Sequence, residues 1–288
     1  MRRRLLVIGS GGVLMLIATA MMARATAANL ASSEEGPAGD GPALESLAEI
    51  PSKGAPDWAL LGQNFYLEGR YRDAVNSLEK AVAVAPSNSA YYDWLGRAYG
   101  RRAEESNVLT AFSYANKTRA AFEKAVALDP RNLEALSDLF EYYLEAPGIV
   151  GGGLEKAVAV AEQIGRLNQA EYHCTLARLA DRRKDARTAE QEFRRARELE
   201  PASTGRVLDL AGFLSRQGRF VESDELFRLA RQLSPDAPRV MFARAAAYIQ
   251  SGRNLPEAKQ LLIDYRASHL TPDDPSPSDA ARLLKRAR

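Results

Sequence analysis

The sequence of 288 residues contains only one cysteine and two histidines. A structural zinc site of the usual kind needs four Cys or His ligands and an internal disulfide needs two cysteines, so we expect no metal site and no disulfide. An excess of one charge is also missing, because 39 Lys and Arg stand against 37 Asp and Glu. Four of these basic residues lie within the first 27 residues, which leaves 35 basic against 37 acidic residues in the rest. Nucleic-acid-binding proteins show a strong basic excess, so we expect no nucleic-acid partner.

The N-terminus has the three-part layout of a secretory signal. Three arginines precede an uncharged apolar stretch over residues 5–23, and a run of small residues with an A-x-A cleavage pattern follows. We therefore expect residues 1–27 to be a signal peptide, and the mature chain to be exported and periplasmic or secreted. The apolar stretch is also long enough to cross a bilayer, so the alternative is an inner-membrane anchor with the rest of the chain outside the cytoplasm. Residues 28–54 show no helical or strand period and are expected to form a disordered linker.

A pattern of aromatic and small residues begins at residue 55 and recurs along the chain. Its first copy consists of Trp58, Leu61, Gly62, Phe65, Ala74, Leu78, Ala81 and Pro86. Trp58, Leu61 and Phe65, at spacings of three and four, lie on one face of a helix. The small residues Gly62, Ala74 and Ala81 allow a second helix to approach closely. Pro86 ends that second helix because it excludes helical geometry for the residue before it. The pattern resembles the 34-residue helix-turn-helix signature of the tetratricopeptide repeat.

This resemblance implies an all-α fold, a right-handed superhelical solenoid of five to six antiparallel helix pairs over residues 55–266. The repeats are expected near residues 55–88, 89–132, 133–169, 170–203, 204–237 and 238–266. Residues 267–288 should form a C-terminal capping segment, whose last helix Ser278 could cap.

Two repeats depart from the regular period. The second is ten residues too long, with the surplus in the insertion 101–119, so we expect both of its helices to project beyond the others. The third contains the Gly-rich loop 147–153, which favours a flexible connection over a phosphate cradle because no Gly-Lys-Ser/Thr follows it. The combination resembles a group of exported bacterial tetratricopeptide proteins without an assigned activity, so it implies no catalytic role.

The resemblance also implies that the first helix of each pair lines a concave side where peptides or partner helices bind. The residues predicted to bind a partner there are Gln63, Tyr66, Asp93, Arg97, Arg101, Glu134, Glu141, Glu145, Arg178 and Arg182, with Cys174 beside them. Along the predicted groove the charges alternate from basic to acidic to basic, which favours a partner of mixed charge. The alternative is that these residues only keep the helix faces solvated.

Catalytic patterns are missing from the sequence. His173 and Cys174 are neighbours, which point in different directions on a helix, so they do not form a nucleophile and base pair by themselves. His173 takes the place of Trp58 and Tyr92 in the repeat, which favours packing. His269 lies at the edge of a proline-rich tail beside no activating motif. We therefore expect no enzymatic activity and no cofactor.

Two functions fit these observations. The first is a non-enzymatic scaffold in the bacterial cell envelope that binds a protein or peptide of unidentified nature on the concave surface of the array. The alternative is a membrane-tethered structural subunit of an envelope complex, with contacts on the extended second repeat and the convex face. The sequence leaves the oligomeric state open.

Overall fold

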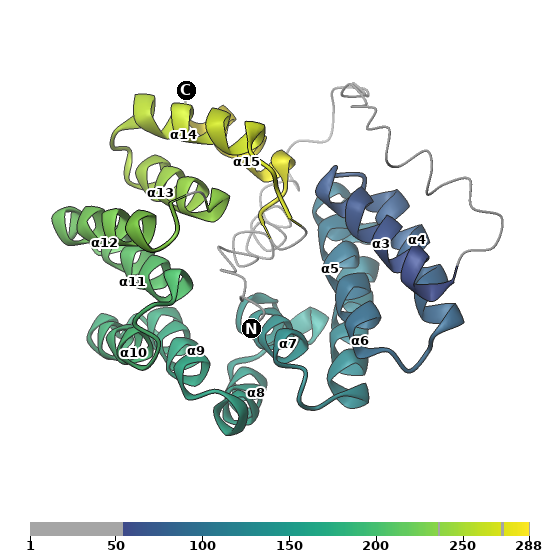
Figure 1. Ribbon diagram of the computed structural model, residues 1–288. Helices are drawn as coiled ribbons and strands as arrows, with labels where there is room; N and C mark the ends of the chain where they lie inside the picture. Colours follow the sequence, from purple (N-terminus) through teal and green to yellow (C-terminus); the bar gives the residue numbers. More distant parts are fainter. Residues whose placement is uncertain (1–53, 236, 272–273, 288) are drawn as a thin grey trace. The chain divides into compact units, whose positions relative to one another are not determined.

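A computed structural model describes residues 54–235, 237–271 and 274–287. Within these ranges the regular structure is helical and no strand is present, which confirms the all-α prediction (Figure 1). No helix in the described part combines the length and apolar character needed to cross a membrane. The signal or anchor predicted for residues 1–27, and the linker up to residue 53, lie outside the described residues.

The chain divides into two compact units. The described residues of the N-terminal unit are 54–66 and 70–153, and those of the C-terminal unit begin at Leu154 and include Leu67–Gly69. The boundary at Gly153 lies inside the third predicted repeat, between its two helices. The right-handed superhelical path of the array as a whole stays a prediction.

The helices of the N-terminal unit pair through small residues. They are α3 (Ala55–Leu67), α4 (Tyr71–Val84), α5 (Ser89–Glu105), α6 (Val108–Leu128) and α7 (Leu133–Glu145), followed by a short 3-10 turn, η2 (Gly148–Val150). A Cβ atom added at Gly62 of α3 would lie 2.6 Å from Cγ of Leu78 in α4, and one added at Gly96 of α5 would lie 2.5 Å from Phe122 in α6. Glycine is therefore required at both crossings, as the repeat pattern predicts.

The second repeat is extended in both of its helices. Helix α5 has 17 residues and α6 has 21, whereas the other helices of the predicted repeats have 13 or 14. Both helices of the second repeat are therefore lengthened, with more of the surplus in the second helix. The added first turn of α6 exposes apolar side chains, and Leu109 is 85% exposed.

The Gly-rich loop is ordered rather than flexible, which corrects the interpretation of the sequence. Backbone N–H groups of Gly151, Gly152 and Gly153 donate to carbonyls of Gly148, Pro147 and Tyr143 at 2.8 to 3.2 Å. A Cβ atom on Gly152 would lie 1.8 Å from the carbonyl oxygen of Ala146. Steric closeness therefore explains the glycine here, and the internal hydrogen bonds leave these three N–H groups unavailable to a phosphate.

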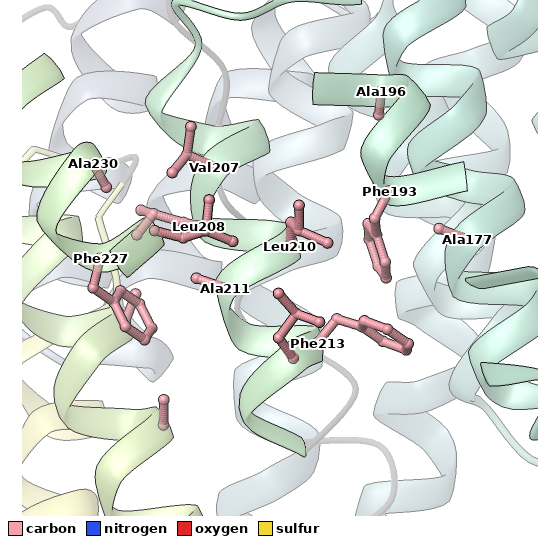
Figure 2. Packing of buried hydrophobic residues seen from close by; sticks show 14 of the residues in the cluster. Ala177, Phe193, Ala196, Val207, Leu208, Leu210, Ala211, Phe213, Phe227 and Ala230 are labelled. Carbon is pink, nitrogen blue, oxygen red and sulfur yellow. The ribbon is translucent and has the colours of Figure 1, made fainter. Parts of the chain in front are cut away.

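The C-terminal unit is a regular series of helices around α11. Its helices are α8 (Leu154–Leu167), α9 (Gln169–Arg182), α10 (Ala186–Leu199), α11 (Thr204–Arg216), α12 (Phe220–Leu233), α13 (Pro238–Ser251), α14 (Leu255–Ala267) and α15 (Pro277–Arg286). Figure 2 shows side chains of α11 reaching both neighbouring helices. Phe213 packs against Phe193 of α10, with ring centroids 5.3 Å apart, while Leu208 lies toward Phe227 of α12.

The last helix, α15, packs on α13 and α14. Leu283 and Leu284 are partly buried against the apolar cluster that contains Tyr265. The N-cap is Ser276 rather than Ser278, because Pro277 takes the first helical position, which suits a residue without an N–H. The hydroxyl of Ser276 accepts from the N–H of Asp279, whose carboxylate accepts from the N–H of Ser276 in a capping box.

Candidate functional site

Four charged side chains gather where α5 contacts α7 in the N-terminal unit. Asp93 and Arg97 come from α5, and Glu134 and Asp138 come from α7; we call these four residues the N-terminal charge cluster. Arg97 binds a carboxylate on each helix, with Nη2 3.0 Å from Oδ2 of Asp93 and Nε 2.5 Å from Oδ2 of Asp138. The Asn132 side chain accepts from the Ala135 N–H at 3.2 Å and so fixes the start of α7 beside Glu134. Arg97 therefore ties two successive first helices together.

The N-terminal charge cluster has more negative than positive charge. The cluster contains three carboxylates and one guanidinium, and Glu134 is exposed and makes no hydrogen bond or ion pair with the described residues. The Asp93 side chain is only 3% exposed, and its Oδ1 atom is buried without a hydrogen-bond partner. Burial raises the pKa of Asp93 well above its usual value; Arg97 opposes this rise, and the charges of Asp138 and Glu134 add to it.

Aromatic rings border this cluster. The guanidinium of Arg97 lies over the ring of Trp94, 4.6 Å from its centroid. Tyr66 of α3 makes edge contacts with Trp94 and with Tyr71 of α4, at centroid distances of 5.7 and 5.4 Å. Arg101, one turn beyond Arg97, donates to the Tyr71 hydroxyl at 2.7 Å. These contacts hold the polar side chains of the first helices in one arrangement.

A second cluster of charged side chains joins α9 to α11 in the C-terminal unit. We call Glu171, Cys174, Arg206 and Asp209 the C-terminal charge cluster. Arg206 contacts Glu171 at 2.6 Å and Asp209 at 3.5 Å, and it also contacts Glu200 at 3.1 Å. The Cys174 thiol donates to Oδ2 of Asp209 at 3.1 Å. This cluster also connects first helices of successive repeats.

The cysteine of this cluster is poorly suited to nucleophilic chemistry. Burial raises the pKa of Cys174, and the negative charge of Asp209 raises it further, so the thiol stays protonated. Burial also raises the pKa of Asp209, although Arg206 and Arg178 oppose the rise. His173 points to another partner, since its Nδ1 lies 2.6 Å from Oε2 of Glu192. Cys174 and His173 are thus engaged separately.

The predicted partner-binding residues differ in their exposure to solvent. Asp93, Arg101 and Glu141 are buried, and Glu134 and Arg182 are exposed. The half-buried members are Gln63, Tyr66, Arg97, Glu145 and Arg178. The structure brings Asp93, Arg97 and Glu134 together on successive first helices, and it gives Asp93 and Arg97 a structural role as well. Their binding of a partner stays a prediction.

The sequence interpretation missed Asp138, Arg206 and Asp209. A usable signal exists in the C-terminal unit, where Glu171 pairs with Arg206 and Cys174 pairs with Asp209, each across 35 residues. Residues that lie one repeat and one position apart therefore face each other on successive first helices. Pairing of complementary groups at this spacing would have found them. In the lengthened second repeat the same spacing becomes 45 residues and relates Asp138 to Asp93. The ion-pair partner Arg97 lies 41 residues before Asp138, so this rule does not find the pair.

No group of three or more His, Cys, Asp or Glu side chains in the described ranges could hold a metal ion. The charged groups of the two clusters are carboxylates and guanidinium groups, and the C-terminal cluster also contains the Cys174 thiol. Their chemistry is ion pairing and hydrogen bonding, which suits recognition of charged side chains.

The paired helices of both units define a helical repeat protein. A family model, the tetratricopeptide repeat, matches residues 58–88. This match identifies a tetratricopeptide repeat at residues 58–88, and solved tetratricopeptide repeat proteins share the fold of the chain. Proteins of this family are typically non-enzymatic scaffolds that bind proteins or peptides. No curated protein sequence matches the chain.

Solved structures share the fold at low sequence identity. A thermophilic tetratricopeptide protein from Thermus thermophilus is 22% identical, and the match covers 68% of this chain and 100% of that one with a TM-score of 0.52. A tetratricopeptide protein from Parabacteroides merdae is 15% identical over 85% of this chain and 91% of that one, with a TM-score of 0.56. Yeast Tom70 is 17% identical over 81% of this chain and 47% of that one, with a TM-score of 0.51.

Proposed function

We propose that this protein is a non-enzymatic scaffold of the bacterial cell envelope that holds a protein or peptide segment on the first helices of its repeats. The tetratricopeptide fold generally serves as such a scaffold, and stacked repeats offer an extended surface for it. The repeated first helices would form the concave side of a right-handed array. Catalysis is not part of the proposal.

The observation that carries the proposal is the ordered state of the first-helix side chains in the N-terminal unit. Arg97 is held by two carboxylates and by the ring of Trp94, and Tyr66 packs on two rings. A surface that is ordered before binding loses little conformational entropy when the partner arrives. Binding energy can then come from a few anchors near the helices.

The envelope location rests on the sequence of the N-terminus. Arginines before an apolar stretch and a small-residue cleavage pattern are typical of exported proteins. Mass spectrometry of the protein from the producing cell tests this, because cleavage would give a mature chain that starts near Thr26 or Ala28. A full-length product that resists carbonate extraction would instead favour an anchored protein.

Site-specific photo-crosslinking tests the use of the first helices. A photoreactive residue is placed at Gln63 in α3 or Glu145 in α7, and at the exposed Asn76 of α4 as a matched control on a second helix. We expect one partner to be crosslinked from Gln63 and Glu145 and not from Asn76. Crosslinks only from Asn76 would contradict the proposal.

The alternative function uses a different surface, and one observation favours it. The extended tip of α6 exposes Leu109 and Phe112, which are 85% and 38% exposed, and its first turns from Asn107 to Asn116 contain no charged residue. An apolar surface without charges suits a subunit contact. A photoreactive residue at Leu109 that crosslinks the partner in place of Gln63 and Glu145 would favour the assembly role.

A further inference from the structure

We propose that the N-terminal charge cluster is a binding site for a cationic side chain, a lysine or an arginine of the bound segment. The inference rests on the proposed function, because it names the chemistry of the partner at one position of the first-helix surface. Its members are Asp93, Arg97, Glu134 and Asp138, where α5 meets α7.

The first argument is the charge of the cluster. Arg97 contacts both Asp93 and Asp138, and it leaves Glu134 without an ion pair among the described residues. Even with Asp93 protonated, Asp138 and Glu134 together carry more negative charge than one guanidinium neutralises. Charges near a protein surface interact more strongly than in bulk water, so a second cation at this place is attracted.

The second argument is the buried oxygen of Asp93. Its Oδ1 atom lies out of contact with solvent and accepts no hydrogen bond from the described residues, although the structure buries the side chain almost completely. A buried carboxylate oxygen without a donor is costly, and nearly all such atoms in proteins are satisfied. A lysine ammonium brings three donors, and an arginine guanidinium brings five.

Access comes from the α7 side of the cluster. Glu134 is exposed and the Asp138 side chain is 13% exposed, whereas Asp93 is the deepest of the three carboxylates. An arriving cation would meet Glu134 and Asp138 first and Asp93 last. Tyr66, which packs on Trp94 beside Arg97, offers an aromatic surface for the methylene groups of a lysine.

Cation binding at this site should depend on pH. The groups that face Asp93 are Arg97 on its own helix, and Glu134 and Asp138 on α7, while Tyr66 of α3 faces Arg97. Burial raises the pKa of Asp93, so a proton competes with a cation for this carboxylate. Cation binding should therefore strengthen as the pH rises.

The test is a fluorescence titration of the full chain. The sequence has two tryptophans, so Trp58→Phe leaves Trp94 as the reporter beside Arg97. The probe is an end-blocked octapeptide of alternating alanine and lysine, compared with its acetyl-lysine form and with an alanine–glutamate octapeptide. We expect the lysine peptide to change the Trp94 emission at pH 8, with about tenfold weaker binding of the acetyl-lysine peptide, and weaker binding of the lysine peptide at pH 5.

Variants locate the site. Glu134→Gln should weaken binding of the lysine peptide about threefold, since it removes one exposed charge. Asp138→Asn should weaken it about tenfold, since its charge is more buried. Glu162→Gln on α8 is the control, because Glu162 is also exposed and lies in the other unit, and it should change nothing.

Three results would overturn the inference. They are no binding of the lysine peptide at pH 8, tighter binding of the glutamate peptide, or equal effects of Glu134→Gln and Glu162→Gln. None of these results affects the photo-crosslinking experiment, which tests the proposed use of the first helices independently.

Discussion

The two charge clusters use the same architecture with opposite outcomes. Each joins the first helices of two successive repeats, and each has an arginine at its centre, Arg97 or Arg206. In the N-terminal cluster Arg97 shares its charge between two nearly buried carboxylates, and Asp93 keeps one oxygen unsatisfied among the described residues. In the C-terminal cluster the Cys174 thiol donates to Asp209. The charges of Arg206 and Arg178 favour the ionised form of that carboxylate.

The difference shows how one fold can separate structural from functional charge. A cluster whose donors and acceptors are matched holds two helices together and has little left to offer a partner. A cluster with an unsatisfied carboxylate can hold the helices and still gain from a cation that arrives later. Substitutions of one member of each cluster at a time test whether the two clusters differ in this way.

Replacing the central arginines should give the largest effect. Arg97→Met leaves Asp93 and Asp138 side by side at 3% and 13% exposure, so we expect the free energy of unfolding to fall by about 4 kcal/mol. Arg206→Met should cost less, about 2 kcal/mol, because it leaves only Glu171 nearly buried, at 13% exposure, while Asp209 and Glu200 are more exposed and can turn to water. Urea unfolding followed by circular dichroism measures both.

An equal loss in the two variants would mean that the clusters are equivalent, and the comparison would lose its basis. Arg195→Met is the control, because Arg195 is exposed and pairs with Glu198 of its own helix. It should change the stability by less than about 0.5 kcal/mol.

Removing the buried carboxylates should change how stability depends on pH. The folded protein raises the pKa of Asp93 above 3.8, so folding binds a proton there, and this contribution is present below pH 3.8 and is lost as the pH rises through the folded value. The Asp93→Asn variant lacks this pH-dependent loss of stability. Its free energy of unfolding, relative to that of the unmodified protein, should therefore increase as the pH rises. Asp209→Asn should show the same sign with a smaller slope, because two arginines oppose the rise in pKa.

Urea unfolding at several pH values between about 4 and about 8 gives both slopes as differences from the unmodified chain. Titrating groups far from the substituted residue are common to the proteins and cancel. Parallel curves for the unmodified protein and Asp93→Asn would show that the folded state does not hold a proton at Asp93.

The smallest expected effect concerns a turn within the regular C-terminal unit. Lys184, Gly218 and Gly252 follow one another at 34-residue spacing in the turns between paired helices, and all three have positive φ, at 63, 75 and 67°. Lysine pays a steric cost in this conformation that glycine avoids. Lys184→Gly should therefore raise the free energy of unfolding by about 0.5 to 1 kcal/mol, and Gly218→Ala should lower it by a similar amount. A loss of stability in Lys184→Gly would contradict this.

Much of the fold could be predicted because the repeat depends on small residues at fixed positions. Gly62 and Gly96 both lie where a neighbouring side chain occupies the place of a Cβ atom. The Gly-rich loop could not be predicted, because its order depends on the close approach of Gly152 to Ala146 and on hydrogen bonds to Tyr143. Nothing in the glycine pattern itself distinguishes that arrangement from a flexible loop.

The candidate site was only partly predictable. Helical position in the repeat placed Asp93, Arg97 and Glu134 on the first helices of two successive repeats. Burial was not visible, because it depends on which residues of α7 lie opposite α5, and the ten extra residues of the second repeat shift that alignment. Asp138 was missed for this reason, and with it the excess of carboxylates.

Zero-length crosslinking tests the central claim most directly, since a carbodiimide joins an amine only to a carboxylate that it touches. The lysine octapeptide is incubated with the full chain at pH 6.5, carbodiimide is added, and the coupled carboxylates are identified by tandem mass spectrometry. The account predicts that amide bonds form preferentially at Glu134 or Asp138. Coupling spread evenly over exposed carboxylates such as Glu162 and Glu225 would contradict it.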